Sequence, residues 1–472
     1  MKKLFILTIF CALMISVSAS ELKFENYFID KTMRVDYFHT GTANEEHFAI
    51  DRIVSDREWG GSVTQLVDDL AYGLYFFEIR DLETDKLIYS RGFASIFGEW
   101  QTIGEAQKKW GTFHESVRFP WPKKSVKLVM NKRNAKNTFD PIWETVIDPS
   151  SREVNPADMT DKYRVYDHMV NGDAKEKVDI VILGDGYTAG EMDKFRADIK
   201  RLTDYLFTVE PFKSRKKEFN IRAVETPSAK TGVHKPHPGV HNRTPLQVQY
   251  SSFDSERYAL SYDNKAIRDA AAHVPYEFMY ILINERTYGG GGIYNLYASV
   301  AVDNKFSDYI MVHELGHHLA ALADEYYSSS VSYQMPEITV EPWEANITAL
   351  LDGAKPKWHH LIEEGTPIPT PWNKEEFDRH GMEIQKKRGE LRAAKASEEV
   401  LEALFEKQRE TETKLISEME YTGKVGAFEG ASYYQHGMYR SSTDCIMYTR
   451  NGLDFCPVCQ AAISKVIDQY TK

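Results

Sequence analysis

The chain has 472 residues, of which 42% are hydrophobic, and a formal net charge of −12. This length exceeds that of one ordinary hydrophobic core, so two or more domains are expected. The acidic balance argues against a protein that binds nucleic acid, because neutralising phosphates requires surplus Lys and Arg. No feature of the composition indicates an oligomeric state.

Residues 1–20 have the layout of a secretory signal peptide. Two lysines precede an apolar run, and small residues surround the predicted cleavage point after Ala19 or Ser20. The apolar run is too short to span a bilayer comfortably, and no later segment is apolar for long enough to do so. We therefore expect an exported protein, secreted or periplasmic, without an integral membrane segment once the signal is cleaved.

Residues 21–150 predict an accessory domain made of β-strands. The β-rich runs "YGLYFFEIRD" and "KLIYSRGF" are separated by the turn-forming "LETD", which predicts a hairpin. "SVKLVMNKR" alternates between polar and apolar residues, and "WETVIDP" ends at a proline. An antiparallel β-sandwich is the predicted architecture. The polar stretch around residues 150–175 is interpreted as a linker.

The patterns of residues 151–472 predict an α/β domain with a mixed sheet, so the predicted fold class of the whole chain is α+β. "VDIVILGDGY" reads as a buried strand, and Thr188 and Glu191 have the spacing of a capping box. Apolar residues then recur every three or four positions from Met192 to Leu206, which indicates a helix. "FNIRAVE" is the next strand, so this segment forms a βαβ unit. "NKAIRDAAAHV" predicts another helix and "EFMYILIN" another central strand.

Two later segments have unusual composition. Four consecutive glycines, 289–292, precede the alternating "YASVAVDN", and they predict a turn that is mobile or approaches another group closely. Residues 374–420 are rich in Ala, Glu, Lys and Leu with the spacing of exposed helices. We predict a solvated helical insertion there. A helical hairpin that covers the site or binds a partner remains the alternative.

The stretch "MVHELGHHLAALADEYY", residues 311–327, has the chemistry of a metal site. His313 and His317 are four residues apart, so on a helix their rings project from one face, about 6 Å apart along the axis. Two converging nitrogens suit tetrahedral Zn²⁺. Glu314 follows the first ligand, as in the HExxH motif, where zinc lowers the pKa of a bound water. Glu314 then acts as general base and returns the proton to the leaving amine.

A catalytic zinc site needs a third protein ligand, for which Asp324 is the prediction. In a continuous helix Asp324 would lie about 10 Å beyond His317, so the chain must leave the helix and fold back. The alanines in this segment do not mark such a break. Glu325 is the next candidate, and Glu429 in "FEGA" could supply a carboxylate from another element. His318 points about 100° away from His317 and is expected to be packed or solvated.

Two further groups of potential ligands have less specific patterns. The loop "VHKPHPGVH" could form a second metal site, although free loop histidines are the more common case. These are His234, His237 and His241. Three cysteines remain after signal cleavage, all near the C-terminus, and a local structural staple is their predicted role. They are Cys445, Cys456 and Cys459.

"HELGHHLAALADEYY" resembles the HExxH…DEY signature of the IgA peptidase family of secreted bacterial zinc metallopeptidases. "VILGDGYT", "ESVRFPWP" and "GAFEGASYYQHGMYRSSTDCIM" followed by "FCPVC" are similar to other parts of that family. The resemblance implies a metzincin-like catalytic domain behind a β-sandwich, with Met447 in a Met-turn beneath the metal. Ala320 stands where familiar metzincins carry glycine. Tyr439 or Tyr448 could donate to the oxyanion of the tetrahedral intermediate.

From these observations we expect an exported zinc endopeptidase that holds one catalytic ion and hydrolyses protein or peptide substrates. The substrate would lie along "YASVAVDN" by β-augmentation, and the glycine-rich turn would control access. The alternative is an exported binding protein in which the β-sandwich binds the partner and the metal site is vestigial or structural.

Overall fold

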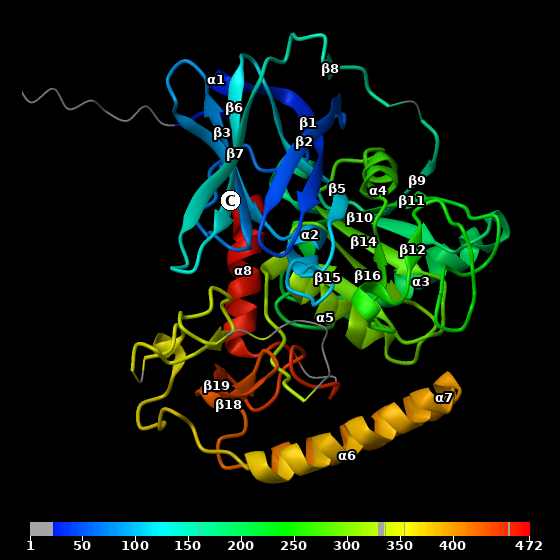
Figure 1. Ribbon diagram of the computed structural model, residues 1–472, viewed down its shortest axis with the longest axis vertical. Helices are drawn as coiled ribbons and strands as arrows, with labels where there is room; N and C mark the ends of the chain where they lie inside the picture. The colour runs from blue at the N-terminus through cyan, green and yellow to red at the C-terminus, as the bar shows by residue number, and fades with distance from the viewer. Residues whose placement is uncertain (1–21, 160, 329–334, 336, 354, 452–453) are drawn as a thin grey trace, which may run out of the picture.

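The computed structural model describes residues 22–159, 161–328, 335, 337–353, 355–451 and 454–472. The predicted signal peptide lies outside these residues. Within this part of the chain, no helix is both long and apolar enough to cross a membrane. The chain forms an N-terminal β-sandwich, a six-stranded sheet covered by helices, and a long helical hairpin (Figure 1).

The N-terminal domain is a sandwich of two four-stranded sheets. One has the order β5 (Gly111–Pro122), β1 (Phe28–Gly41), β2 (Glu46–Ser55) and β8 (Val154–Asn155), and only β8 pairs in parallel. The other has the order β4 (Leu87–Phe93), β3 (Tyr75–Asp81), β6 (Val126–Arg133) and β7 (Phe139–Ile147). Inward-facing residues of both sheets, such as Val35, Tyr37, Phe77 and Leu128, form one buried cluster. The predicted sandwich and its β3–β4 hairpin are confirmed.

The sandwich is firmly docked on the second domain. Its short helix α2 (Ile96–Trp100) was not predicted; it packs into a hydrophobic cluster shared with the six-stranded sheet. The buried Arg34 guanidinium forms ion pairs with Asp56 of the sandwich and with Asp269 of α4 (Asn264–Ala271). The N-terminal helix α1 (Phe24–Tyr27) precedes β1. The contacts of α2 and Arg34 with the second domain fix the sandwich beside the face of the sheet that α4 covers.

The second domain is built on a mixed sheet. Its strands are ordered β15 (Gly290–Ile293), β16 (Tyr297–Ala301), β14 (Phe278–Ile283), β10 (Val178–Asp185), β11 (Phe219–Glu225) and β9 (Arg164–Met169). The four inner strands are parallel, whereas β9 and β15 are antiparallel edges. Helix α3 (Met192–Leu206) joins β10 to β11, which confirms the predicted βαβ unit. The predicted linker supplies β9; as a largely exposed edge strand it needs no apolar run.

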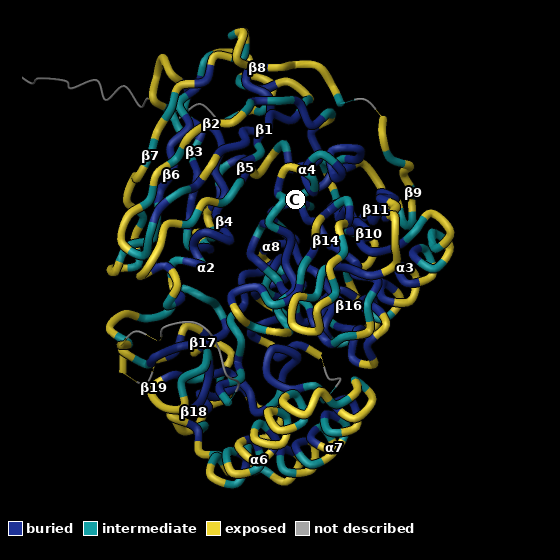
Figure 2. Tube along the Cα trace, turned by 45° about the vertical axis from the view of Figure 1, so that its right-hand side comes forward, coloured by how far each residue is buried: buried dark blue, intermediate teal, exposed yellow. Residues whose placement is uncertain are grey.

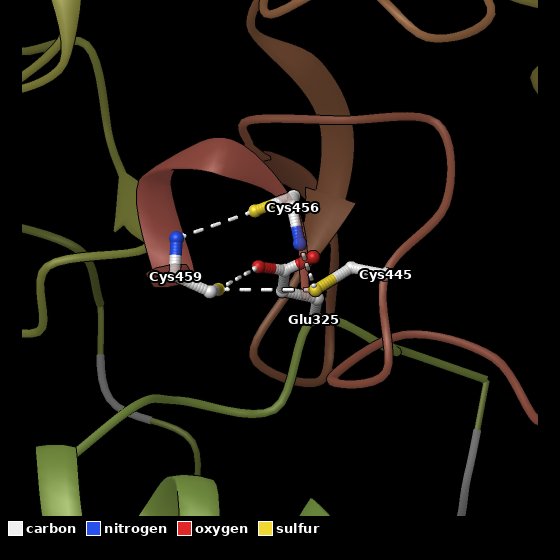
Figure 3. A group of neighbouring side chains, drawn as sticks. All are labelled: Glu325, Cys445, Cys456 and Cys459. Atoms are coloured by element: carbon white, nitrogen blue, oxygen red, sulfur yellow. Dashed lines mark hydrogen bonds between the residues drawn. The ribbon is translucent and has the colours of Figure 1, made fainter. Parts of the chain in front are cut away.

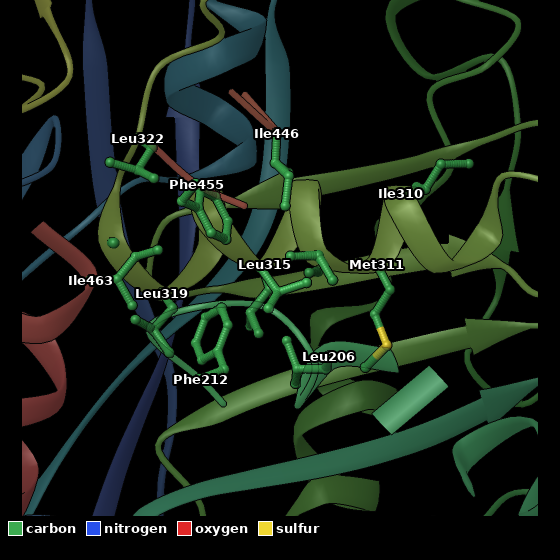
Figure 4. Packing of buried hydrophobic residues seen from close by; sticks show 14 of the residues in the cluster. Leu206, Phe212, Ile310, Met311, Leu315, Leu319, Leu322, Ile446, Phe455 and Ile463 are labelled. Carbon is green, nitrogen blue, oxygen red and sulfur yellow. The ribbon is translucent and has the colours of Figure 1, made fainter. Parts of the chain in front are cut away.

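Alternate residues of the central strands feed two hydrophobic layers. Ile180 and Ile182 of β10 face a cluster formed with α3, α5 (Ser307–Ala320) and α8 (Pro457–Thr471). Val181 and Leu183 face the opposite cluster, formed with α4, β12 (Val248–Gln249) and β13 (Leu260–Ser261). Figure 4 shows α5 within the first cluster, with Leu315 and Leu319 pointing towards Leu206 and Phe212. The apolar face of α5 is thus held in the core, which leaves its other face for chemistry.

Helices α6 (Lys374–Ala393) and α7 (Glu398–Ser417) form the hairpin predicted as a solvated insertion. Its outer surface is exposed (Figure 2), but Leu401 and Phe405 are buried. The Phe405 ring packs against Tyr288 and Phe306 of the second domain. Glu402 accepts a hydrogen bond from the Lys305 backbone N–H. The hairpin is therefore seated on the domain, as the site-covering alternative requires.

The remaining elements are short. A three-stranded sheet has the order β17 (Ile347–Thr348), β19 (Tyr434–Arg440) and β18 (Phe428–Ala431). The 3₁₀ turns are η1 (Ala174–Glu176), η2 (Ala189–Glu191), η3 (Lys216–Glu218), η4 (Ser252–Asp254) and η5 (His359–Leu361). The predicted capping box is present, since Thr188 and Glu191 cap η2 at the entry to α3.

Candidate metal centre

One face of α5 lines a cleft of about 580 Å³. Ile310, His313, Glu314 and His317 occupy positions i, i+3, i+4 and i+7 of the helix, so the helical repeat brings them onto one side. The opposite side of α5 carries the apolar residues of the core. The two histidines therefore face the cleft because the other face of the helix is anchored beneath it.

Three donor atoms meet at one point of this cleft. His313 Nε2 and His317 Nε2 are 3.1 Å apart, and Asp324 Oδ1 lies 3.1 Å from the first and 3.2 Å from the second. In a tetrahedral zinc site, ligands at 2.0–2.1 Å from the ion are about 3.4 Å from one another. The triangle of donors thus has nearly the dimensions that a tetrahedral ion requires.

The outer nitrogens of both histidines are held by backbone carbonyls. His313 Nδ1 donates to Ile446 O at 3.0 Å, and His317 Nδ1 donates to Leu322 O at 2.5 Å. Because a carbonyl only accepts, each Nδ1 carries a proton, which leaves each Nε2 as the atom that can bind a metal ion or a second proton in the triangle. Two lone pairs and a carboxylate oxygen repel one another unless a cation lies between them. The donor set therefore fits a bound divalent metal ion.

The electrostatics of the triangle also favour a positive charge. Burial by itself lowers the pKa of His317, but the Asp324 carboxylate overcomes this effect and raises that pKa to about 9. Burial likewise opposes the charged form of Asp324, yet the two histidines hold its pKa well below the usual range. Each group thus stabilises the charged form of its neighbour, which is the environment that a cation needs.

The return of the chain to Asp324 begins at Ala321, which adopts a left-handed conformation with φ of 53°. The Ala321 N–H donates to His317 O, and the Leu322 N–H donates to Gly316 O at 3.3 Å. Left-handed helix ends usually carry glycine. Since alanine occupies this position, the sequence does not mark the end of the helix that lets Asp324 fold back to the histidines. Asp324 O then accepts a bond from the Ser432 N–H at 2.9 Å.

Met447 lies against the underside of α5. Its side chain is fully buried, and a Cβ on Gly316 would be 2.8 Å from its Sδ. Gly316 precedes His317, so the sulfur packs directly behind the histidine pair. The neighbouring Ile446 carbonyl orients His313, and the Met447 carbonyl accepts the Glu325 N–H at 2.8 Å. This segment thus supports the triangle from below, where the resemblance placed a Met-turn.

The other candidate carboxylates face elsewhere. Glu325 Oε1 lies 3.3 Å from Cys459 Sγ and groups with the three cysteines, not with the histidines. Glu429, on β18, accepts the Gly437 N–H at 3.2 Å and pairs with His436. Of the three acids considered from sequence, Asp324 alone meets the histidines.

The remaining histidines lie outside the triangle. His318 is buried, donates to Ile293 O and accepts the Met279 N–H, so it is packed as expected. Within the described residues, the loop histidines of 234–241 form no group with metal-ligand spacing.

Glu314 is half-buried in the cleft beside the triangle. Burial raises the pKa of its carboxyl, while the positive field of His313 and His317 opposes the rise. A carboxylate whose pKa is raised towards neutrality is suited to accept a proton and return it.

The glycine-rich segment forms the edge strand β15, directly on α5. A Cβ on Gly292 would fall 2.3 Å from Glu314 O and 3.0 Å from the His317 Cβ. Gly290 and Gly292 are therefore explained by close approach to α5, whereas a Cβ on Gly289 or Gly291 would meet Tyr250 or Tyr258 instead. β16 lies between β14 and β15, so the prediction that substrate pairs along "YASVAVDN" is wrong. Both edges of β16 are already occupied.

β15 has an outward-facing edge towards the cleft. On the side away from β16, the Gly290 N–H donates to Arg257 O at 3.2 Å, and the Gly290 carbonyl accepts a hydrogen bond from the Ala259 N–H at 3.3 Å. Because strand residues alternate, the backbone groups of Gly292 face the same way. Gly292 also lines the cleft. An extended peptide would therefore meet the sheet at Gly292.

Several aromatic groups around the triangle were not predicted. The Tyr433 hydroxyl donates to Asp324 Oδ2, and the Tyr309 hydroxyl lies 3.3 Å from His313 Nδ1. The Tyr326 ring stacks on His313 with ring centres 6.1 Å apart. Adjacency in "DEYY" marks Tyr326, but no spacing connects Tyr433 with Asp324. Of the two predicted oxyanion donors, Tyr448 lines the cleft, whereas Tyr439 lies on β19 outside it.

The walls of the cleft come from all parts of the molecule. Ser95 and Glu99 belong to the sandwich, and Phe377 and Gln385 to α6. Glu412 of α7 also lines it and accepts a hydrogen bond from Gln408 at 2.7 Å. Burial raises the pKa of Glu412 from 4.5 to about 7, against the opposing effects of Gln408 and Arg450.

The raised pKa of Glu412 predicts a pH-dependent stability. The folded state keeps the proton of Glu412 that the unfolded state loses above pH 4.5, so this contribution is present below pH 4.5 and lost as pH rises through about 7. The substitution Glu412→Gln removes the titrating carboxyl and therefore this loss of stability at higher pH. Relative to wild type, its free energy of unfolding should rise between pH 4.5 and 8, by up to about 3 kcal/mol.

Urea unfolding at several pH values measures this difference. The matched control is Glu410→Gln on the same helix, where the side chain is exposed. Its difference from wild type should stay constant across the range. A Glu412→Gln curve that runs parallel to wild type would contradict the prediction.

Two family models match the chain. The model described as IgA Peptidase M64 matches residues 168–467, and the model described as Peptidase M64 N-terminus matches residues 23–144. A search of curated proteins finds no significant match. The first model covers more than half of the chain and contains the histidine–aspartate triangle. The chain belongs to the IgA peptidase M64 family and is a metallopeptidase, as the resemblance predicted.

Proposed function

We propose that this metallopeptidase is an exported zinc endopeptidase whose catalytic ion is held by His313, His317 and Asp324. The proposal is carried by the triangle of donor atoms, 3.1 to 3.2 Å apart, with both Nδ1 atoms engaged by carbonyls. Three protein ligands leave a fourth position for water or substrate, which is typical of catalytic zinc. The signal-peptide layout of residues 1–20 supports export.

The chemistry follows from the groups around that position. A zinc ion bound there would lower the pKa of a water molecule and polarise the scissile carbonyl. Glu314 takes the proton from the attacking water and delivers it to the leaving amine. Tyr433 holds the outer oxygen of Asp324, which keeps the inner oxygen directed at the histidines.

The substrate would be an extended segment of a protein or peptide. Its backbone pairs with the outward-facing groups of Gly292 at the edge of β15, because main-chain pairing gives affinity without a particular side chain. The Arg257 guanidinium also lines the cleft, 5.9 Å from the centre of the Tyr326 ring. It offers a positive charge near the reacting carbonyl or a substrate carboxylate.

Hydrolysis of a protein substrate by the purified chain tests the proposal. We expect internal cleavage of an unfolded protein, loss of activity with a zinc chelator, and recovery when Zn²⁺ is added back. Activity that resists chelation would overturn the role of the metal. A chain that holds zinc but cleaves nothing would support the alternative of a binding protein with a vestigial site.

A further inference from the structure

A second group of potential metal ligands is formed by one glutamate and three cysteines. Figure 3 shows Glu325 and the three cysteines, Cys445, Cys456 and Cys459, pointing towards a common centre. One ligand atom from each lies within 4.8 Å of all the others. Cys445 Sγ and Cys459 Sγ are 3.8 Å apart, and Cys459 Sγ is 3.3 Å from Glu325 Oε1. The four side chains come from three separate segments of the chain.

These side chains are closed off from solvent. Glu325 and Cys459 are 0% exposed, and Cys445 and Cys456 are 1% and 3% exposed. Within the described residues, Glu325 Oε2 is buried without a hydrogen-bond partner. A buried carboxylate is costly unless it is paired or coordinates a metal. The unpartnered oxygen therefore indicates a missing positive partner at this place.

Backbone amides already surround the sulfur atoms. The Cys456 N–H donates to Cys445 Sγ at 3.2 Å, and the Cys459 N–H donates to Cys456 Sγ at 3.4 Å. Asn346 Nδ2 donates to Glu325 Oε1 at 3.0 Å. Such donors stabilise thiolates and orient a carboxylate, as the groups around metal ligands commonly do.

We propose that Glu325, Cys445, Cys456 and Cys459 bind a second zinc ion in a closed, four-coordinate site. Thiolates select a soft or borderline cation such as Zn²⁺, and four protein ligands leave no position for substrate. The ion is therefore structural. A disulfide between Cys445 and Cys459 is the competing arrangement. It would leave Cys456 as a free thiol and the Glu325 Oε2 atom without a hydrogen-bond partner in the core.

The position of this site relates it to the catalytic centre, a consequence that rests on the proposed function. Glu325 directly follows Asp324, and its N–H bonds to Met447 O. Cys445 precedes Ile446, whose carbonyl orients His313. Cys456 and Cys459 begin α8, which packs against α5. An ion held by these residues joins the segments that position the third ligand and one histidine.

Metal analysis of the mature chain, without the predicted signal peptide that contains Cys11, tests the proposal. Wild type should contain two zinc ions, and Asp324→Ala and Cys459→Ser should each retain one. Cobalt-substituted Asp324→Ala should show a thiolate-to-cobalt charge-transfer band, which a site of histidines and carboxylates lacks. In denaturant with chelator, all three thiols should react with a thiol reagent. A wild-type chain with one reactive thiol would establish the disulfide and overturn the proposal.

The two zinc sites fail separately in these measurements. If Cys459→Ser keeps the full metal content of wild type, the second site is refuted while the catalytic site stands. If Asp324→Ala keeps the full metal content of wild type, the assignment of Asp324 as a ligand of the catalytic ion is refuted instead. Ile463→Ala is the matched control, because Ile463 is buried in α8 but offers no ligand. It should lower stability and retain both ions. Loss of an ion from this control, with no charge-transfer band in cobalt-substituted Asp324→Ala, would also overturn the proposal.

Discussion

Replacing Glu314 by glutamine is expected to lower kcat/KM for peptide hydrolysis by about 10²- to 10⁴-fold, the usual contribution of general acid–base catalysis. Glutamine keeps the size of the side chain but cannot accept a proton at neutral pH. The triangle of His313, His317 and Asp324 does not include Glu314, so metal content and fold should be unchanged. The loss should appear in kcat, because the proton is transferred in the transition state.

Steady-state kinetics, metal analysis and thermal unfolding of the purified variant measure these effects together. Glu429→Gln is the matched control, since Glu429 is the carboxylate that the sequence also offered and it pairs with His436. That variant should cleave at the wild-type rate. A Glu314→Gln protein that cleaves at the wild-type rate would eliminate Glu314 as the general base. Slow cleavage by Glu429→Gln would indicate that the Glu429 carboxylate takes part in the active site.

Replacing Asp324 by alanine is expected to remove one zinc ion per chain and nearly all peptidase activity. The substitution leaves two neutral imidazoles and no anionic ligand, so zinc affinity should fall by at least about 100-fold, the upper range for losing only a supporting group. Without Asp324, the Tyr433 hydroxyl also loses its acceptor. Titration with a zinc-binding dye gives the affinity, and addition of excess Zn²⁺ should restore little activity.

The variant Tyr433→Phe should show a smaller loss of zinc affinity than Asp324→Ala. It removes the hydroxyl that donates to Asp324 Oδ2 but keeps the ring and the carboxylate. Zinc affinity should fall by about 10- to 100-fold, less than for Asp324→Ala. Equal zinc content and activity in wild type and Asp324→Ala would mean that the third ligand lies elsewhere.

The arrangement of the cleft gives the sandwich and the hairpin a role in the proposed catalysis. Ser95 and Glu99 of the sandwich form one wall, and Phe377 and Glu412 of the hairpin form another. A substrate at the edge of β15 would contact both. This position supports a sandwich that helps to bind peptide substrate, rather than one that acts as an independent binding module beside a vestigial site.

Much of this architecture was predictable because it depends on local repeats. The βαβ unit around α3, the β3–β4 hairpin and the helix that carries His313 and His317 follow from periodicity and turn residues. The spacing of four residues on a helix by itself places both imidazoles on one face. The strand β9 was missed, because a largely exposed edge strand has no apolar run to mark it.

The third carboxylate depended on the tertiary structure. Asp324 and Glu325 are adjacent and chemically similar, yet one meets the histidines and the other meets the cysteines. The left-handed turn at Ala321 and the bond from Glu325 to Met447 determine which side chain faces which way. Neither has a signal in the sequence, because alanine is a helix former and the partner lies more than a hundred residues away.

The sequence by itself therefore determined the strand and helix types and the pair of histidines with a neighbouring acid. Residues close along the chain have relative positions set by helix or strand geometry alone. The tertiary structure decided which acid completes the triangle, why Gly290 and Gly292 lie against α5, and how three cysteines gather around Glu325. These outcomes depend on packing between distant segments, whose energies are shared among many contacts that no local pattern records.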